Sequence, residues 1–345
     1  MAAEQEGARG RERRPTLADV AAAAGVSTST ASRALRDSPL VSAATRDRVR
    51  AVSQLLGFEP DRLARSLRTR ASLFVGVIVP DVATVFYAAA LKGAQSVFES
   101  AGYQVLVMDS ERDGGREREN LRTLLAHRVD GLLLATSGGF EAAAGVPVVF
   151  FDQVVFGSGV GSVALDNRAG IELLVGHLLE HGHRRVAFVG APPGLTSATE
   201  RLDAFRGALR AAGLDAADDD VRLGDAVWSE ASGERAMREH LARAEPPTAV
   251  VAGSDTLAIG ALRAIRAAGL AVPRDVALVA FDDPVYGDLI DPPVTALSRH
   301  DRELGERAAR LLLGTLQNGE VRAPAEIRVA AELIVRRSCG CGGSA

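Results

Sequence analysis

TLADVAAAAGVSTSTASRAL, residues 16–35, contains two short helix patterns separated by a glycine. Apolar side chains at helical spacing predict a first helix up to Ala24. Gly25 follows, and glycine adopts left-handed backbone angles without steric cost, so it can end that helix. Ser27 is a good N-cap for a second helix. Two short helices joined by a glycine-containing turn indicate a helix-turn-helix motif, although an ordinary αα-hairpin would show the same pattern.

The second helix carries side chains that suit the reading of DNA. In a helix-turn-helix motif this helix lies in the major groove. Its polar side presents the short hydroxyl groups of Thr28, Ser29 and Ser32 together with Arg33. An arginine can donate two hydrogen bonds to one guanine, and serine or threonine can reach any base edge. The pattern therefore favours a DNA-reading helix.

Residues 45–56 predict a third helix that closes a small core over the first two. Its apolar stripe, ended by Gly57 and covered by Phe58, consists of Val49, Val52, Leu55 and Leu56. Residues 60–71 are basic and too short to be stable as an isolated helix in water, because helix nucleation is costly. We expect this segment to be a linker that becomes helical only when something supports it.

Charge is unevenly distributed along the 345 residues. Residues 1–71 contain 13 Arg and 8 acidic residues, a net charge of +5, whereas the whole chain carries −4, so the remainder carries −9. A basic domain joined to an acidic one is expected where only the first contacts nucleic acid, although a fluctuation of surface charge would give the same division. The polar residues 1–14 predict a disordered arm.

The composition is that of a folded protein, with 47% hydrophobic and 24% charged residues. No apolar run reaches the roughly 18 residues of a membrane span, and the N-terminal residues lack the apolar centre of a signal peptide. We therefore expect a cytoplasmic protein that does not associate with membranes.

From Ser72 onward, strand patterns alternate with helix patterns. Residues 73–80, LFVGVIVP, form a continuous apolar run, as expected for a parallel strand buried on both faces. Similar runs recur, and a second series of strands and helices is expected to begin at residues 162–166. Repeated βα units predict doubly wound parallel sheets. The length is too great for one such sheet, so we expect two α/β lobes with a ligand site between them, at the carboxyl ends of the strands.

Several stretches, in matching order and at matching spacing, resemble the LacI–GalR family of bacterial transcription regulators. They are TLADVAAAAGVSTSTASRAL, FEPDRLARSLRT, VGVIVPD, RVDGLLLAT, HLLEHGHRRVAFVG, PPTAVVAGSDTLAIGALRAIRAAGLAVPRDVALVAFDD and PPVTALSR. The resemblance covers nearly all of residues 15–338. It implies a homodimer that binds palindromic double-stranded operator DNA, as a repressor, under the control of a small, sugar-like effector.

The resemblance also implies a division of the chain. The expected parts are a disordered arm (1–14), an all-α helix-turn-helix headpiece (15–59), a hinge helix (60–71), a two-lobed core like the periplasmic sugar-binding proteins (72–338) and a flexible tail (339–345).

DNA contacts are implied in the headpiece. Thr28, Ser29 and Arg33 match positions that reach base edges, and Thr16 and Ser32 match positions suited to phosphate contact.

DNA contacts are implied in the hinge as well. Leu67 matches the leucine that wedges into the minor groove at the operator centre, with Arg65 beside it. An apolar wedge partly unstacks a base step and bends the duplex, so that more protein surface engages. A plain helix-packing role for Leu67 is the alternative.

The expected effector site has two sources. The resemblance implies Phe86, Tyr87, Arg201, Trp228 and Ser254, and the rule of strand carboxyl ends adds Asp152, Asp255 and Asp282, which stand at or just after the ends of expected strands. Aromatic faces pack against the C–H face of a sugar or a base ring, and carboxylates accept hydrogen bonds from hydroxyl groups. Arg201 can fork onto hydroxyl, carboxylate or phosphate groups. Phe86 could instead belong to the core, and Asp255 could cap the helix that follows it. Gln153 and Ser254 stand where the family usually has Arg and Asn, which bears on the identity of the effector.

Histidines and cysteines occur at spacings that could suggest a metal site. His177 and His181 share a helix face, but EHGHRRVAFVG reads as a helix-to-strand turn common in the family. Cys339 and Cys341 lie in the expected flexible tail, and two ligands alone make no closed zinc site. We therefore expect no metal site and no cofactor.

Two other classes of protein predict different sequences. An extracytoplasmic solute-binding protein would have a signal peptide and no headpiece. A sugar-processing enzyme with an added DNA-binding arm would have paired catalytic carboxylates or a metal site, and no nucleophile–base set emerges here. GSGVGS (157–162) lacks the spacing and the following helix of a dinucleotide loop. The sequence favours an effector-responsive transcription regulator over an enzyme.

Overall fold

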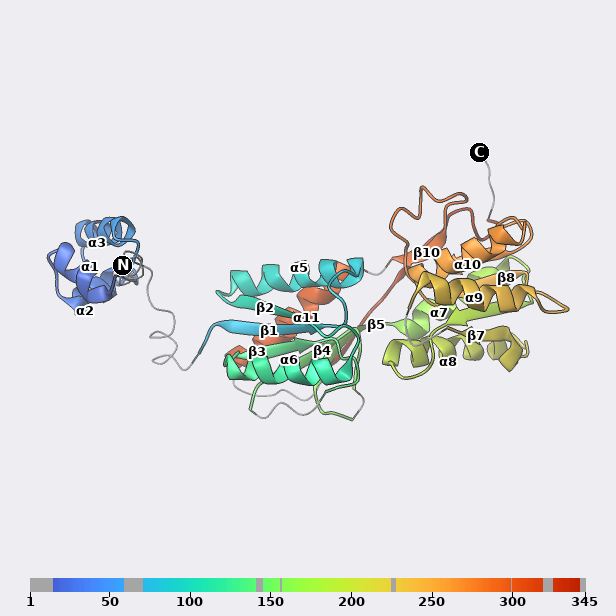
Figure 1. Cartoon of the computed structure of the whole chain (residues 1–345), viewed down its shortest axis with the longest axis horizontal. Helices are drawn as coiled ribbons and strands as arrows, with labels where there is room; N and C mark the ends of the chain where they lie inside the picture. Colours follow the sequence, from blue (N-terminus) through green and yellow to red (C-terminus); the bar gives the residue numbers. More distant parts are fainter. Residues whose placement is uncertain are drawn as a thin grey trace, which may run out of the picture. The chain divides into compact units, whose positions relative to one another are not determined.

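The structure is a computed structural model that describes residues 15–58, 71–140, 145–155, 157–224, 228–298, 300–318 and 325–341. It divides into two compact units, a headpiece up to residue 72 and a core from residue 73 (Figure 1). No helix in these ranges is both long enough and apolar enough to cross a membrane.

The headpiece has the predicted three helices, α1 (Leu17–Ala23), α2 (Thr28–Ala34) and α3 (Ala43–Leu55). A hydroxyl side chain caps each N-terminus, and the caps are Thr16, Ser27 and Ser42. Gly25 adopts φ +64° between α1 and α2, as a left-handed helix end requires.

The core of the headpiece is small and is built from short side chains. Val20, Ala31, Ala34 and Val49 are fully buried. The prediction for Leu55 is wrong, because its side chain is 87% exposed. At about 100° per residue, Leu55 lies far around α3 from Val49, whereas Leu56, seven residues after Val49, returns to the buried face.

The first lobe of the core is a six-stranded parallel sheet. Its strands, in spatial order, are β11 (Glu326–Val329), β5 (Gly161–Leu165), β4 (Val148–Phe151), β3 (Gly131–Leu134), β1 (Phe74–Val79) and β2 (Gln104–Asp109). Helices α5 (Val85–Ser100) and α11 (Asp301–Asn318) pack on one face, and α6 (Gly114–Ala126) packs on the other (Figure 1).

The second lobe contains another six-stranded sheet. Its strands are β12 (Glu332–Ile334), β10 (Thr295–Ser298), β9 (Ala277–Ala280), β8 (Ala249–Ala252), β6 (Val186–Gly190) and β7 (Val221–Leu223), and only the β10–β12 pair among them is antiparallel. Helices α7 (Asn167–Glu180) and α8 (Thr196–Ala211) cover one face, and α9 (Glu230–Leu241) and α10 (Asp255–Ala267) cover the other. A 3₁₀ turn spans Asp218–Asp220.

One prediction about the sheets is wrong, and one strand was not predicted. Residues 162–166 do not begin the second lobe, because β5 pairs with β4 of the first sheet, with Ser162 opposite Phe150. The pattern also contained no prediction for β10. Among the described elements, the chain passes between the lobes after β5, after β10 and after β11. A buried apolar run shows that a strand exists but does not show which sheet it joins.

The tail prediction is wrong for residues 339–341. Cys339 is fully buried, and the hydroxyl of Thr295 on β10 donates a hydrogen bond to its Sγ atom at 3.2 Å. The carbonyl of the preceding Ser338 accepts a hydrogen bond from the backbone of Leu278 on β9. The core therefore continues to Cys341, held by long-range contacts that a glycine-rich local sequence does not reveal.

Candidate functional site

The exposed side of α2 carries the side chains predicted to reach base edges. Thr28, Ser29 and Arg33 are all exposed. Ala31 and Ala34 lie on the opposite side of the same helix and are fully buried. The helix is therefore anchored by its small residues and presents hydroxyl and guanidinium groups to solvent.

Two residues predicted to contact phosphate have roles within the headpiece itself. The hydroxyl of Thr16 accepts a hydrogen bond from the backbone N–H of Asp19 at 3.3 Å, and the backbone N–H of Thr16 donates to the carboxylate of Asp19 at 2.7 Å, which together form a capping box. The hydroxyl of Ser32 accepts from Arg36 Nη2 at 3.1 Å. The two hinge residues, Arg65 and Leu67, lie outside the described residues.

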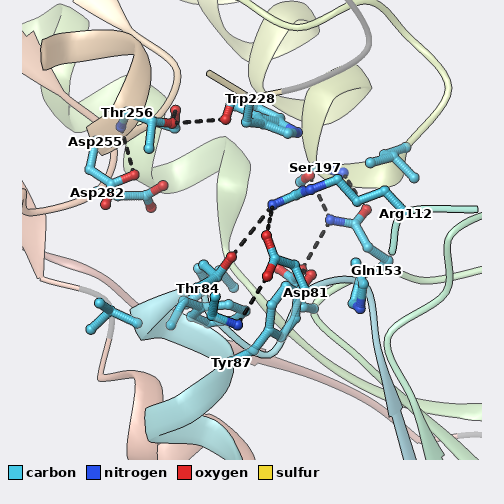
Figure 2. A pocket seen from close by; sticks show the side chains of 18 of the residues that line it. Asp81, Thr84, Tyr87, Arg112, Gln153, Ser197, Trp228, Asp255, Thr256 and Asp282 are labelled. Carbon is cyan, nitrogen blue, oxygen red and sulfur yellow. Dashed lines mark hydrogen bonds and ion pairs between the residues drawn. The ribbon is translucent and has the colours of Figure 1, made fainter. Parts of the chain in front are cut away.

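A cavity of about 750 Å³ lies between the two lobes of the core. It is bordered by the carboxyl ends of β1, β3, β4, β8 and β9 and by the first turns of α5, α8 and α10 (Figure 2). Every residue predicted for the effector site lines it, namely Phe86, Tyr87, Asp152, Arg201, Trp228, Ser254, Asp255 and Asp282. Its volume is within the range of about 300–1,000 Å³ usual for ligand pockets.

Asp152 is the centre of the hydrogen bonding on the first-lobe wall. Tyr87 donates its hydroxyl proton to Asp152 Oδ2 at 2.7 Å, and Gln153 Nε2 donates to the same oxygen at 3.1 Å. The same Gln153 nitrogen lies 2.8 Å from the hydroxyl of Ser197 on α8, so this residue joins the two lobes (Figure 2). Burial raises the pKa of Asp152, and the bond from Tyr87, the charge of Arg201 and the bond from Gln153 oppose that rise.

Asp152 also has a rare backbone conformation, with φ +64° immediately after β4. A residue other than glycine in the left-handed region costs about 1–3 kcal/mol, and such residues cluster at functional sites. The residue in this conformation is the one whose carboxylate lines the cavity and accepts the hydrogen bond from Tyr87.

Arg201 holds together the second-lobe wall. Its Nε atom donates to Asn167 Oδ1 at 2.8 Å, and Nη1 donates to the carbonyl of Gly253 at 2.6 Å. Nη1 also lies 3.6 Å from the carboxylate of Asp282, and both side chains are only 5–6% exposed. The guanidinium therefore positions α7, the end of β8 and the carboxylate of Asp282 in addition to bordering the cavity.

Aromatic rings surround the same region. The guanidinium carbon of Arg201 lies 3.6 Å from the ring centre of Phe281 and 5.4 Å from that of Trp228. Phe86 packs edge-on against Tyr87, with ring centres 4.8 Å apart. Phe86 is 4% exposed, so it belongs to the core and borders the cavity at once, and its two proposed roles do not exclude each other.

Ser254 and Asp255 divide the roles that the sequence left open. The hydroxyl of Ser254 accepts a hydrogen bond from the backbone N–H of Leu257 at 3.2 Å and is the N-cap of α10. Asp255 is the first residue of that helix, and its carboxylate accepts from the N–H of Thr256 at 2.7 Å. The capping role considered for Asp255 therefore belongs to Ser254.

The sequence predictions missed several polar residues of the cavity. Arg112 Nη2 lies 3.2 Å from Asp81 Oδ2 and 3.4 Å from the hydroxyl of Thr84 (Figure 2). The other missed polar lining residues are Thr136, Ser137, Ser197, Glu230 and Thr256. Gln153, which the sequence singled out as a departure from the family, lines the cavity as well. Asp81, Arg112 and Thr136 each stand just after a first-lobe strand, so the rule of strand carboxyl ends would have found them.

Comparison with known proteins places this architecture in a family. Residues 16–61 match the family described as "Bacterial regulatory proteins, lacI family", and residues 175–339 match "Periplasmic binding protein-like domain". The transcriptional regulator CelR of Thermobifida fusca is 36% identical over 342 residues, which cover 95% of this chain and 99% of CelR. The chain belongs to the LacI family.

Other members of the LacI family are similar over comparable lengths. The transcriptional repressor CytR of Escherichia coli K12 is 31% identical over 337 residues, 96% of this chain and 98% of CytR. A Lac repressor dimer bound to operator and the anti-inducer ONPF superposes with a TM-score of 0.85 at 29% identity, covering 95% of this chain and 99% of that one. A CelR–cellobiose complex gives a TM-score of 0.71 at 33% identity, covering 94% and 100%.

These matches confirm the fold class and the function predicted from the resemblance. This LacI-family chain is a DNA-binding transcription regulator with a helix-turn-helix headpiece and a two-lobed core. The named relatives are transcription regulators.

Proposed function

We propose that the chain is a dimeric repressor whose affinity for operator DNA is controlled by a neutral sugar bound in the interlobe cavity. The observation that carries the proposal is the convergence of all eight residues predicted for the effector site, from both lobes, on one cavity of about 750 Å³. A ligand that touches both walls can change how the lobes sit against each other. The effector class then follows from the chemistry of the lining.

The charge of the lining favours hydroxyl groups over phosphate. Five acidic residues line the cavity, against two basic residues, Arg112 and Arg201. Each arginine already lies beside a carboxylate, Asp81 for Arg112 and Asp282 for Arg201. An anionic ligand would have to displace these carboxylates or approach the others, whereas a sugar hydroxyl donates to a carboxylate and accepts from an arginine.

The aromatic residues suit the other face of a sugar. Trp228 and Phe86 border the cavity from opposite lobes and offer flat apolar surfaces to C–H groups. The similar CelR structure holds cellobiose, which makes this disaccharide the first compound to test.

Coupling to DNA follows from the two-lobed arrangement. Gln153 and Ser197 form a direct hydrogen bond between the lobes, and both residues also line the cavity. A bound effector would therefore contact the same residues that join the lobes. An effector controls the operator affinity only through its different affinity for the two arrangements. In the dimer, that difference decides whether the two hinge segments (60–71) can pair and insert Leu67 into the minor groove.

A thermal unfolding series tests the effector class. At a sugar concentration 100 times Kd, the bound state is stabilised by about 2.7 kcal/mol. Cellobiose, glucose and ribose are compared with glucose 6-phosphate and a nucleoside. Stabilisation by a neutral sugar supports the proposal, and stabilisation by the phosphate alone refutes it.

Two matched variants locate the binding. Asp255→Asn alters a lining carboxylate, whereas Asp203→Asn alters an exposed one on α8 outside the cavity lining. The first should weaken the sugar response, and the second should leave it unchanged. Equal responses in both variants would remove Asp255 from the site.

Operator binding tests the hinge. Leu67→Ala should weaken binding to the specific operator strongly and spare binding to non-specific DNA, because a minor-groove wedge acts only where the operator bends. Equal losses on both DNAs would refute the wedge.

A further inference from the structure

The C-terminal residues of the core meet the end of α7 at a cluster of sulfur and nitrogen atoms. Cys341 Sγ lies 3.0 Å from Nε2 of His177, 3.0 Å from Nε2 of His181 and 2.8 Å from Sγ of Cys339. The ligand atoms of His177, Cys339 and Cys341 all lie within 4.8 Å of one another. From the sequence, the histidines were expected at a helix end and the cysteines in a flexible tail, far from each other along the chain.

The helix geometry orients both imidazole rings toward the cysteines. His177 and His181 are four residues apart, so their side chains lie on one face of the α7 end. Their ring centres are 4.6 Å apart. His181 Nδ1 lies 2.7 Å from the carbonyl oxygen of His177, which requires the proton on Nδ1 and leaves the Nε2 lone pair directed at Cys341. A backbone carbonyl that fixes a histidine in this way is the usual support of a metal-binding ring.

We propose that Cys339, Cys341, His177 and His181 bind one Zn²⁺ ion. Two thiolates and two imidazoles form the tetrahedral donor set that zinc prefers in closed, structural sites. With Zn–S near 2.3 Å and Zn–N near 2.0–2.1 Å, neighbouring ligand atoms of a tetrahedron are about 3.3–3.8 Å apart. The contacts around Cys341 therefore need to widen by roughly 1 Å or less to admit the ion. His181 contacts Cys341 but falls outside the compact group of His177, Cys339 and Cys341, so its exposed ring must also move toward that group to complete the set.

Burial suits a closed structural site. Cys339 is fully buried and His177 is 9% exposed, whereas Cys341 and His181 are on the open side. An ion can therefore enter from solvent and finish in contact with the core. None of the four residues lines the effector cavity, so the site is separate from the one described above.

The ion would fasten the end of the chain to α7. The segment after β12 returns along the second lobe to Cys341, and α7 begins at Asn167, which accepts the hydrogen bond from Arg201. His177 is ten residues from Asn167, or about 15 Å along the helix. Zinc would thus rigidify the helix whose other end supports the effector wall.

Metal titration of the reduced, chelator-treated full-length protein tests the site. We expect one Zn²⁺ per chain, measured in competition with a chromophoric chelator, and a tetrahedral thiolate spectrum with Co²⁺. Cys341→Ser and His181→Gln should each lower the zinc affinity by at least ~100-fold, the upper end of the loss that follows removal of a supporting partner. Both positions are at the open side, so the fold is retained, which circular dichroism checks. His127→Gln, an exposed histidine at the end of α6, should bind zinc like the wild type.

Three results would overturn the proposal. The first is that reduced wild-type protein binds no zinc beyond the Cys339→Ser/Cys341→Ser variant. The second is that Cys341→Ser and His181→Gln bind zinc as tightly as His127→Gln, which means an adventitious ion only. The third is that Cys339 and Cys341, after reduction of any disulfide between them, both remain reactive toward a thiol reagent in the presence of Zn²⁺. A rise in Tm with Zn²⁺ that is confined to the wild type and His127→Gln would support it.

Discussion

Replacing Arg201 with methionine should lower the unfolding free energy of the second lobe by about 3–5 kcal/mol, because it removes one partner of a buried ion pair. The guanidinium lies 3.6 Å from Asp282, both side chains are 5–6% exposed, and methionine keeps the length of the stem but none of the charge. Asn167 and the carbonyl of Gly253 lose hydrogen bonds in the same variant. The double variant Arg201→Met/Asp282→Asn removes the buried carboxylate charge as well and should recover about 0.5–3 kcal/mol as a coupling energy.

Urea unfolding followed by tryptophan fluorescence measures this effect. Trp228 is the only tryptophan in the chain and lies in the second lobe, so the signal reports the unfolding of that lobe. Arg263→Met is the control, because its ion pair with Glu230 is exposed (60% and 44%) and should contribute about 0–1 kcal/mol. Additive losses in the double variant would show that Arg201 and Asp282 are not coupled. A loss in Arg201→Met no larger than that of the control would refute the structural role of Arg201.

Three further predictions concern other parts of the chain. His240 is buried, and desolvation lowers its pKa to about 4, so the folded state holds it neutral. The stability that this neutral His240 contributes is fully present above the unfolded pKa of about 6.5 and falls by roughly 3 kcal/mol as the pH drops toward 4. Urea unfolding of His240→Gln should therefore show a flatter pH dependence than the wild type, and parallel curves would contradict this. Gly260→Ala should destabilise the protein by about 1–3 kcal/mol, because a Cβ atom at this position would collide with the backbone of Glu230. Gly207→Ala on α8 should stabilise the protein by about 0.5–1 kcal/mol in the same assay, because a Cβ atom there would meet open space. Arg33→Ala should weaken specific operator binding by about 1–3 kcal/mol and change non-specific binding less, as measured by fluorescence anisotropy; equal changes would exclude base readout.

Local signals in the sequence predicted the elements of the fold well. The headpiece helices follow from N-caps and from Gly25, because these act within a few residues of the helix ends. The cavity residues followed from the resemblance together with their positions after strands. Asp152 and Asp282 come after β4 and β9, and the carboxyl ends of parallel strands share one edge of a sheet.

Other site features could not be predicted because they depend on partners far along the chain. The hydrogen bond between Gln153 and Ser197 joins residues of different lobes, and nothing near either residue indicates the other. Asp255 was the candidate cap of α10, but the structure gives that role to Ser254, which has the extended backbone of an N-cap, while Asp255 is the first helical residue. Leu55 is a different case, because helical spacing alone sets it about 120° around α3 from Val49, and its exposure could therefore have been predicted from the sequence.

The sequence by itself determined the helix-turn-helix and the alternation of strands and helices, because these depend on short-range periodicity and on the ends of elements. The predicted residues that border the effector cavity came from the resemblance to the family and from their positions after strands. The tertiary structure alone decided that β5 belongs to the first sheet and that the chain passes repeatedly between the lobes. It also decided that Cys339 and Cys341 lie against His177 and His181, more than 150 residues earlier in the chain. Such long-range pairings depend on which buried surfaces fit together, and a local sequence pattern does not specify which surfaces these are.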